Sequence, residues 1–360
     1  MNEAQKKIIA LAKKILNEIK SGKNPSIEIP KRTLANIIFD EKTGRILLGE
    51  EVVRRYFLNI AHAKKFMQTL LIASHAKRLL DENATNSLRE VFYVFKRPIH
   101  GMKENIFDNQ KESDPVIVDL EVSLGVTREE LNITADRKGY AAGNMTVVDM
   151  GDEIDLRKMG SGGWGIPSNV EPHRVQFKEV DADFVLVVEK DAVWQRLNED
   201  KFWKKYNCIL VTPKGQAARG TRRLIHRLRY EHNLPVYVFT DYDPWGFYIY
   251  SVIKRGSMNL AHLSEKLATP DAKFIGLVYE DIKKFEIPKH VFMKQKDVDK
   301  KRAHELMNYE WFKTKEWQKE LKQFIKSGIK LEMEALAQKD IRFYSQKYLP
   351  TKLKEKSFLP

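Results

Sequence analysis

The chain has 360 residues, a length that suggests about two domains, and its 42% hydrophobic and 10% aromatic content excludes a globally disordered protein. Lys and Arg number 63 against 49 Asp and Glu, which gives a formal net charge of +14. This excess favours a polyanionic partner such as nucleic acid, although a lysine-rich protein without such a partner, or a protein of the membrane surface, would show the same balance.

The single cysteine, Cys208, lies in an apolar run at 208–211. One cysteine can form neither an intramolecular disulfide nor a cysteine-based zinc site, so we expect a buried structural thiol in a reducing compartment. No apolar run approaches the roughly 18 residues of a membrane span, and residues 1–20 interleave Lys with apolar residues, unlike a secretory signal. We therefore expect no contact with a membrane.

The first part of the chain favours helices. Apolar residues recur at helical spacing in 2–20 and again in 59–80, and Ser87 followed by Glu90 forms a capping box that predicts a further helix at 88–97. The N-terminal helix either docks on its own domain or binds a partner.

Two extended segments, 132–135 and 141–148, surround a turn that carries Arg137 and Lys138. Helices followed by a basic β-hairpin are typical of a winged-helix (CAP-like) DNA-binding domain, in which these two side chains would contact phosphates, although any solvated hairpin could carry them. The Gly-rich stretch at 159–165 predicts a linker and lacks the Gly-Lys-Ser/Thr of a phosphate-binding loop.

After the linker, apolar strands alternate with helices. Strands are expected at 184–188, 208–211, 235–240 and 272–277. Continuous apolar strands separated by helices predict a parallel, doubly wound α/β sheet. We therefore expect a multidomain α/β protein with four segments: an N-terminal helix and small β extension at 1–58, the winged-helix domain at 59–158, a linker at 159–182, and the α/β domain with a helical C-terminal part at 183–360.

Three carboxylates follow strands of the predicted sheet. Glu189 comes directly after the first strand, and Asp241 and Asp243 come directly after the third. The carboxyl ends of parallel strands meet at one edge, where close carboxylates repel each other unless a cation lies among them, and oxygen ligands suit Mg²⁺. A lone Asp after a strand is more often a helix cap, but the combination favours a metal site and resembles the Toprim fold of topoisomerases and primases.

Arg89 and Tyr93 lie four residues apart on the helix that the capping box opens, so they share one face. A guanidinium beside a phenol suits attack of the tyrosine on a phosphodiester, because the arginine neutralises the phosphate and stabilises phenolate character. Such a pair is more often a packed surface pair, and with 13 tyrosines in the chain the spacing alone does not select Tyr93.

Together, in this order, the two groups of residues resemble the A subunit of archaeal DNA topoisomerase VI, a family related to the meiotic double-strand-break transesterase. The resemblance extends from about residue 27 to the C-terminus and is carried by the stretches 87–93, 188–191, 212–216, 219–223 and 234–246. It implies a Toprim domain in which Glu189, Asp241 and Asp243 hold Mg²⁺. It also implies that Tyr93, supported by Arg89, forms a 5′-phosphotyrosyl ester with DNA.

The resemblance further implies partners and an activity. We expect a type II DNA topoisomerase, an isomerase that breaks and reseals double-stranded DNA, built as a homodimer in which each tyrosine works with the partner protomer's metal site. An ATPase B subunit would complete an A2B2 heterotetramer and bind the ATP, since this chain has no nucleotide-binding motif. The expected location is the cytoplasm of an archaeal cell, associated with the nucleoid.

Four further basic residues are candidate phosphate contacts, although each could equally lie on a solvated helix face: Lys214, Arg219, Arg222 and Arg223. Three other functions stay open. The chain could be a transesterase that breaks DNA without resealing it, a non-catalytic DNA-binding scaffold, or a hydrolytic Toprim nuclease.

Overall fold

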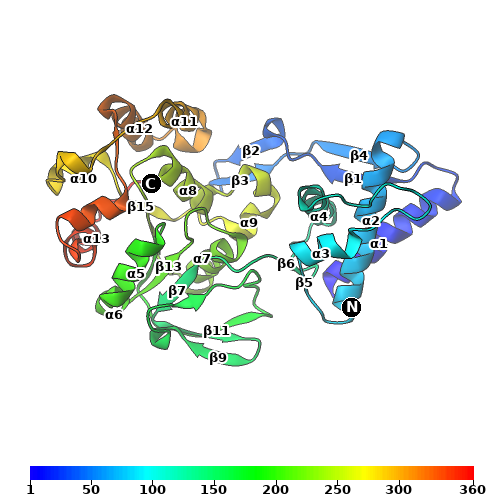
Figure 1. The fold of residues 1–360 in the computed structure, drawn as a ribbon, viewed down its shortest axis with the longest axis horizontal. Helices are drawn as coiled ribbons and strands as arrows, with labels where there is room; N and C mark the ends of the chain where they lie inside the picture. The colour runs from blue at the N-terminus through cyan, green and yellow to red at the C-terminus, as the bar shows by residue number, and fades with distance from the viewer. The chain divides into compact units, whose positions relative to one another are not determined.

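The computed structural model describes residues 1–360 and divides them into two compact units (Figure 1). Unit 1 comprises Met1–Ile38 and Leu47–Asp136, and unit 2 comprises Phe39–Ile46 and Arg137–Pro360. None of the helices combines the length and the apolar character that a membrane span requires.

Unit 1 is mainly helical. Its four helices are α1 (Glu3–Lys20), α2 (Ile60–Asp81), α3 (Leu88–Phe95) and α4 (Gln110–Leu124). Each helix contributes buried apolar side chains to one core cluster, so the amphipathic spacing in the sequence is what holds the helices together. Strand β1 (Ser26–Pro30) pairs antiparallel with β4 (Val52–Tyr56), and β5 (Asn86–Ser87) pairs in parallel with β6 (Ile133–Thr134).

The basic hairpin that we expected across 132–148 does not form. Strand β6 pairs with β5, whereas β7 (Tyr140–Gly143) pairs antiparallel with strands of the large sheet in unit 2. Two extended segments that each find backbone partners elsewhere cannot also pair with each other on the same edge. The prediction of a wing with Arg137 and Lys138 at its tip is therefore wrong.

The centre of unit 2 is a six-stranded mixed sheet with the order β10-β7-β13-β12-β14-β15. Its other strands are β10 (Trp164–Gly165), β12 (Phe184–Val188), β13 (Cys208–Thr212), β14 (Val236–Phe239) and β15 (Lys273–Gly276). The four strands β13, β12, β14 and β15 are parallel, which confirms the parallel α/β sheet, and β7 and β10 add an antiparallel edge. Cys208 is buried in this sheet, as expected.

Helices connect the parallel strands and extend the unit beyond them. The connecting helices are α5 (Asp191–Glu199), α6 (Phe202–Lys205), α7 (Arg219–His232), α8 (Pro244–Arg255) and α9 (Ser264–Leu267). The C-terminal helices are α10 (Tyr279–Lys284), α11 (Asp297–Asn308), α12 (Lys315–Ser327) and α13 (Leu349–Glu355), and Figure 1 shows them grouped on the β15 side of the sheet.

A second, three-stranded antiparallel sheet has the order β11-β8-β9. It consists of β8 (Met145–Asp149), β9 (Asp152–Asp155) and β11 (Val175–Val180). Strands β10 and β11 thus occupy part of the segment that the Gly-rich sequence suggested to be a linker. Two small two-stranded pairs remain: β2 (Ile37–Asp40) with β3 (Arg45–Leu48), and β16 (Met293–Lys294) with β17 (Ile329–Lys330).

Candidate active site

Glu189 and Asp241 are neighbours at the carboxyl edge of the parallel strands. Strands β12 and β14 are adjacent, with Val188 opposite Phe239, so the next residues of both strands emerge side by side. The amide of Asp241 donates a hydrogen bond to Glu189 Oε2 at 3.1 Å. Both side chains are buried, with 8% and 5% of their surface exposed. The sheet topology therefore brings two of the three predicted acids together.

Asp243 both caps a helix and faces the other two acids. Its Oδ1 accepts a hydrogen bond from the amide of Gly246 at 2.7 Å, and Pro244 takes the first helical position of α8. Its negative charge also contributes to the raised pKa of Glu189 and of Asp241. The helix-cap role and a place beside the other carboxylates are thus combined in one side chain.

The electrostatics of the three carboxylates show a local deficit of positive charge. Burial, with repulsion from the neighbouring acids, raises the pKa of Glu189 to about 8 and that of Asp241 to about 7. Burial also raises the pKa of Asp243. Buried oxygen donors of this kind fit a divalent cation chemically. In this structure no group of three His, Cys, Asp or Glu side chains is arranged to hold a metal ion. The side chains of the three acids would therefore have to move to bind one.

Lys190 supplies positive charge at this site. Its Nζ lies 3.1 Å from Asp241 Oδ2 and 3.8 Å from Glu334 Oε1. Burial lowers the pKa of Lys190, but the charge of Asp241 outweighs it and raises that pKa overall. The other oxygen of Asp241 accepts a hydrogen bond from the amide of Met333 at 2.8 Å. Sequence reasoning missed these partners, although Lys190 stands within the stretch that carries the resemblance.

Tyr242, between the two aspartates, points away from them. It is fully buried and packs against Phe324 and Phe247, with ring centroids 5.3 and 5.9 Å away. Side chains alternate between the two faces of an extended chain, so Asp241 and Asp243 share a side that Tyr242 does not. Its bulk therefore fills the core on the side away from the acids.

Tyr93 lies on the surface of unit 1 at the predicted helix. The capping box at the start of α3 is formed: the amide of Ser87 donates to Glu90 Oε2 at 2.6 Å, and the amide of Glu90 donates to Ser87 Oγ at 3.2 Å. Tyr93 is 55% exposed, while its helix is anchored by the buried Val91, Phe92 and Phe95.

A cation accompanies the exposed phenol. The guanidinium of Arg89 lies 5.7 Å from the centre of the Tyr93 ring, and Lys96 Nζ lies 5.8 Å from it. The predicted pair of Arg89 and Tyr93 on one helix face is therefore present. It leaves the phenol oxygen accessible next to positive charge.

The candidate phosphate contacts divide into exposed and buried residues. Arg137, Lys138 and Lys214 are exposed. Lys138 Nζ donates to the carbonyl of Gln216 at 2.9 Å, which places it at the loop that carries Lys214. Lys214 Nζ pairs with Asp191 at 3.0 Å and lies 4.7 Å from the centre of the Tyr140 ring.

The three candidate arginines of α7 do not present exposed, unengaged guanidinium groups in this structure. Arg219 and Arg222 are only 8% and 2% exposed. Arg223 binds Glu171 through two hydrogen bonds of 2.9 and 2.8 Å. The prediction that Arg222 and Arg223 contact phosphate directly does not fit this conformation, because one is enclosed and the other already has a bidentate partner.

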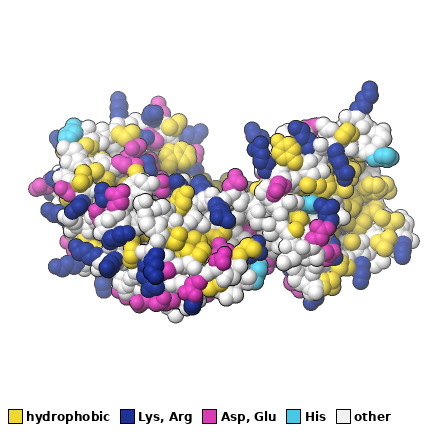
Figure 2. All heavy atoms as spheres, turned by 60° about the horizontal axis from the view of Figure 1, so that its bottom comes forward, with side chains coloured by type: hydrophobic (Ala, Val, Ile, Leu, Met, Phe, Trp, Pro, Cys, Tyr) yellow, Lys and Arg dark blue, Asp and Glu magenta, His cyan; other side chains and the backbone are white.

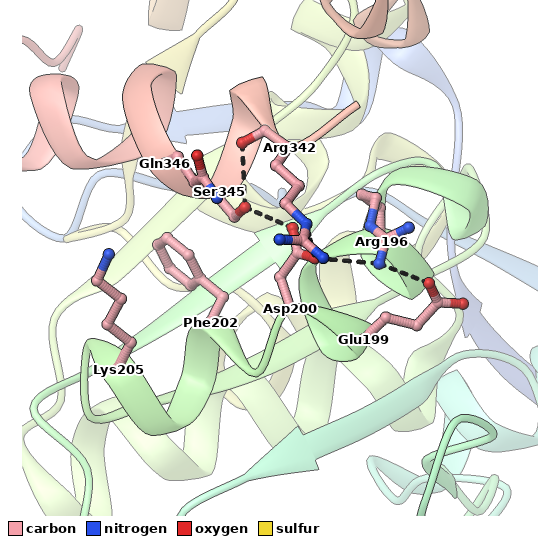
Figure 3. A pocket seen from close by; sticks show the side chains of 8 residues that line it. All are labelled: Arg196, Glu199, Asp200, Phe202, Lys205, Arg342, Ser345 and Gln346. Atoms are coloured by element: carbon pink, nitrogen blue, oxygen red, sulfur yellow. Dashed lines mark hydrogen bonds and ion pairs between the residues drawn. The ribbon is translucent and has the colours of Figure 1, made fainter. Parts of the chain in front are cut away.

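The face shown in Figure 2 has no continuous basic patch. On the face shown in Figure 2, Lys and Arg side chains are scattered among Asp and Glu. A separate polar cavity of about 280 Å³ in unit 2 contains none of the predicted site residues (Figure 3). Two of its polar contacts involve Asp200, which accepts from Ser345 Oγ at 2.5 Å and pairs with Arg196 at 3.0 Å.

Comparisons with known proteins agree with the strand-edge acids. Residues 184–353 match the Toprim domain of the topoisomerase 6 A subunit and Spo11, residues 64–133 match a type IIB DNA topoisomerase family, and residues 138–181 match the all-beta domain in the DNA topoisomerase VI alpha subunit. Similar proteins, each named as the A subunit of type 2 DNA topoisomerase 6, occur in Pyrococcus abyssi (52% identical over 99% of this chain and 95% of the relative), Hyperthermus butylicus (46%, 98% and 95%) and Methanocaldococcus jannaschii (40%, 98% and 95%).

Proposed function

The chain belongs to the family of type 2 DNA topoisomerase 6 A subunits, and on that basis we propose that it is the DNA-cleaving subunit of a type IIB topoisomerase. The observation that carries the proposal is the convergence of Glu189 and Asp241 at the carboxyl edge of a Toprim sheet. It is joined by an exposed tyrosine on a helix of the other unit, with an arginine beside its ring.

In the proposed reaction Tyr93 is the nucleophile. Its oxygen gives up its proton and bonds to the phosphorus of a DNA phosphodiester, and the bond from phosphorus to the 3′ oxygen breaks. The electron pair stays on that oxygen, which takes up a proton and leaves as a 3′-hydroxyl, so no proton is gained or lost overall. The 5′-phosphotyrosyl ester conserves the bond energy, so attack by the 3′-hydroxyl reverses the step without ATP.

Arg89 would bind the phosphate next to Tyr93. Its guanidinium is exposed and can donate two parallel hydrogen bonds to phosphate oxygens. These bonds would hold the phosphorus close to the phenol oxygen and offset the negative charge that builds up during attack.

Glu189, Asp241 and Asp243 would hold a divalent ion, which we propose to be Mg²⁺. When bound, such an ion offsets charge at the phosphate or at the leaving oxygen. Asp243 would orient the start of α8 at the same time, since its side chain caps that helix.

The proposed assembly rests on the family to which the chain belongs and is compatible with the division of the site. Tyr93 belongs to unit 1 and the carboxylates belong to unit 2. We propose a homodimer in which each tyrosine works with the acids of the partner protomer, and an A2B2 complex with an ATPase B subunit, in the nucleoid of the archaeal cytoplasm. Helices α2, α3 and α4 with the β5–β6 pair would form the winged-helix part. Arg137, Lys138 and Lys214 are the proposed phosphate contacts, because they are exposed.

A trapping assay tests the proposal. The full chain is incubated with Mg²⁺ and end-labelled linear DNA or supercoiled plasmid, with and without its ATPase partner and ATP, and then denatured with SDS. We expect label on the wild-type protein, none on Tyr93→Phe, and unchanged capture by the control Tyr230→Phe, a tyrosine that is 40% exposed on α7. Covalent capture by Tyr93→Phe would overturn the assignment.

A second variant tests the proposed metal site. Asp241→Asn keeps an oxygen that can accept from the amide of Met333, so the fold should persist while Mg²⁺-dependent cleavage is lost. Unchanged metal dependence would rule out this site. Plasmid relaxation by the complex with ATP would separate a topoisomerase from a transesterase that does not reseal, and cleavage without attachment would indicate a nuclease.

A further inference from the structure

One tryptophan of the chain is exposed, and it follows Asp243 by two residues. The sequence has six tryptophans. Five of them are between 1% and 8% exposed, whereas Trp245 is 48% exposed. An indole that projects into solvent forgoes a large amount of apolar burial, and its free surface is available to a ligand or partner that covers it.

The position of Trp245 follows from the helix that carries it. It lies in the first turn of α8, directly after Pro244, and Asp243 caps that turn. Because α8 begins at the carboxyl edge of the parallel sheet, the backbone of Trp245 lies at the same edge as Glu189 and Asp241. Any DNA phosphate that reaches the acids brings its flanking nucleotides to this edge.

The ring is held by a cation that is itself fixed. The guanidinium of Arg302, on α11, lies 5.4 Å from the centre of the Trp245 ring and 4.3 Å from that of Tyr248. Arg302 also pairs with Glu305 at 3.0 Å and donates to the Tyr309 hydroxyl at 3.4 Å, and its side chain is only 14% exposed. A cation at this distance restrains the indole, which makes it a preorganised platform.

Given the proposed function, we propose that Trp245 stacks on a nucleobase that is unstacked next to the phosphate attacked by Tyr93. A flat aromatic ring accepts any base, so the contact requires no sequence. In an intact duplex the faces of the bases are covered by their neighbours, and exposing one requires bending or a break. The occupant is therefore a base at a break or kink, and the ring favours deformed or cleaved DNA over relaxed duplex.

The test measures DNA binding without cleavage. The full chain carries Tyr93→Phe and is assayed without divalent ions, with the ATPase partner present. The probes are an intact duplex of about 40 base pairs, long enough to span the interface of a large dimer, and the same duplex with a one-nucleotide gap. In this background Trp245→Ala should weaken binding to the gapped duplex by about tenfold, with less than about a twofold change for the intact duplex. Trp245→Phe should keep most of the preference for the gap.

The matched control is Tyr230→Ala. Tyr230 is another exposed aromatic residue of unit 2, 40% exposed, with the Arg229 guanidinium 5.7 Å from its ring centre. It lies at the end of α7, which is the opposite edge of the sheet from the acids. This variant should bind both duplexes as the parent does. The tryptophan fluorescence of the parent should be quenched by the gapped duplex, and Trp245→Phe should lose that response.

Two results would overturn the proposal. One is equal binding of both duplexes by the parent and by Trp245→Ala, with no fluorescence response. The other is a shift of Trp245→Ala towards monomer in light scattering with the preference for the gap unchanged, which would make the ring a contact between protomers. Neither result depends on whether Tyr93→Phe still captures DNA, so failure of the proposed function would be seen separately.

Discussion

Lys190 Nζ and Asp241 Oδ2 lie 3.1 Å apart at the edge of the sheet where three carboxylates gather. This ion pair gives the site a cation of its own. The side chain of Asp241 is only 7% exposed and that of Lys190 is 29% exposed, so solvent screens the pair only in part. A divalent ion bound to Asp241 would compete with this ammonium group for the same oxygen and would be repelled by its charge. The pair thus bears directly on how tightly the acids can hold a metal.

Lys190→Met should therefore raise the affinity of the chain for Mn²⁺ or Mg²⁺. We expect about a threefold to tenfold lower Kd, where tenfold corresponds to about 1.4 kcal/mol, because the pair is partly exposed and screened by solvent. Isothermal titration calorimetry of the metal into DNA-free protein measures this without any cleavage. Lys214→Met is the matched control: that lysine pairs with Asp191 at 3.0 Å, and its loss should leave the Kd nearly unchanged. Weaker metal binding by Lys190→Met would contradict the expectation.

Gly246→Ala should destabilise unit 2. A Cβ atom at Gly246 would lie 2.5 Å from the carbonyl oxygen of Asp241 and 2.8 Å from Thr240 Oγ1. Alanine has the better helix propensity by about 1 kcal/mol, but this clash is with backbone that cannot move without shifting Asp241. We expect a net loss of about 1–3 kcal/mol in the free energy of unfolding, measured by urea denaturation.

The control for this substitution is Gly162→Ala. A Cβ atom at Gly162 would meet nothing within 4 Å. Its free energy of unfolding should stay close to that of the wild type. Equal stability of the two variants would show that the start of α8 tolerates displacement.

Arg89→Ala should slow covalent capture by about a hundredfold while Tyr93 remains in place, because an exposed guanidinium next to the phenol is the proposed ligand for the phosphate. Arg89→Lys should recover only part of the rate, since an ammonium group cannot form two parallel hydrogen bonds. Single-turnover trapping of labelled DNA measures both. Lys96→Met removes a cation at a similar distance from the ring, 5.8 Å, and should have a much smaller effect. A comparable loss in this control would show that charge alone matters.

Lys254 should make stability depend on pH. It is 6% exposed and donates to the carbonyl of Ala272 at 2.6 Å. Burial, assisted by the charges of Arg255 and Lys273 and opposed by Asp271, lowers its pKa to about 7. In the unfolded chain a lysine has a pKa of about 10.4, so between about pH 7 and 10 the unfolded state binds more protons than the folded state. The stability contributed by this group therefore rises with pH across that window.

Replacing this lysine removes the dependence. The free energy of unfolding of the wild type minus that of Lys254→Met should increase as the pH is raised from about 7 to about 9, by at most about 1.4 kcal/mol per pH unit. Urea denaturation at several pH values measures it, and effects common to both proteins cancel in the difference. The exposed Lys319→Met should show no such trend. A fall of this difference with rising pH would have the wrong sign for a buried lysine whose pKa is lowered.

Local sequence determined the elements that carry the site. The capping box of Ser87 and Glu90 placed the helix of Tyr93, and the apolar run before Glu189 placed strand β12. Asp241 and Asp243 could be assigned to a shared edge because parallel strands present their carboxyl ends on the same side. These predictions depend on short-range periodicity and on one topological rule, so they needed no knowledge of distant contacts.

The tertiary structure decided what depends on partners far along the chain. The extended segments β6 and β7 look like a hairpin in sequence, yet each pairs with a different strand. In sequence, Arg222 belongs to what looks like an exposed basic helix face, yet packing leaves it only 2% exposed. Trp245, by contrast, remains exposed to solvent. Lys190 and the amide of Met333 meet Asp241 only in the folded chain. Backbone pairing and burial are settled by competition among all segments for the same core, and periodicity in a single segment does not record the outcome of that competition.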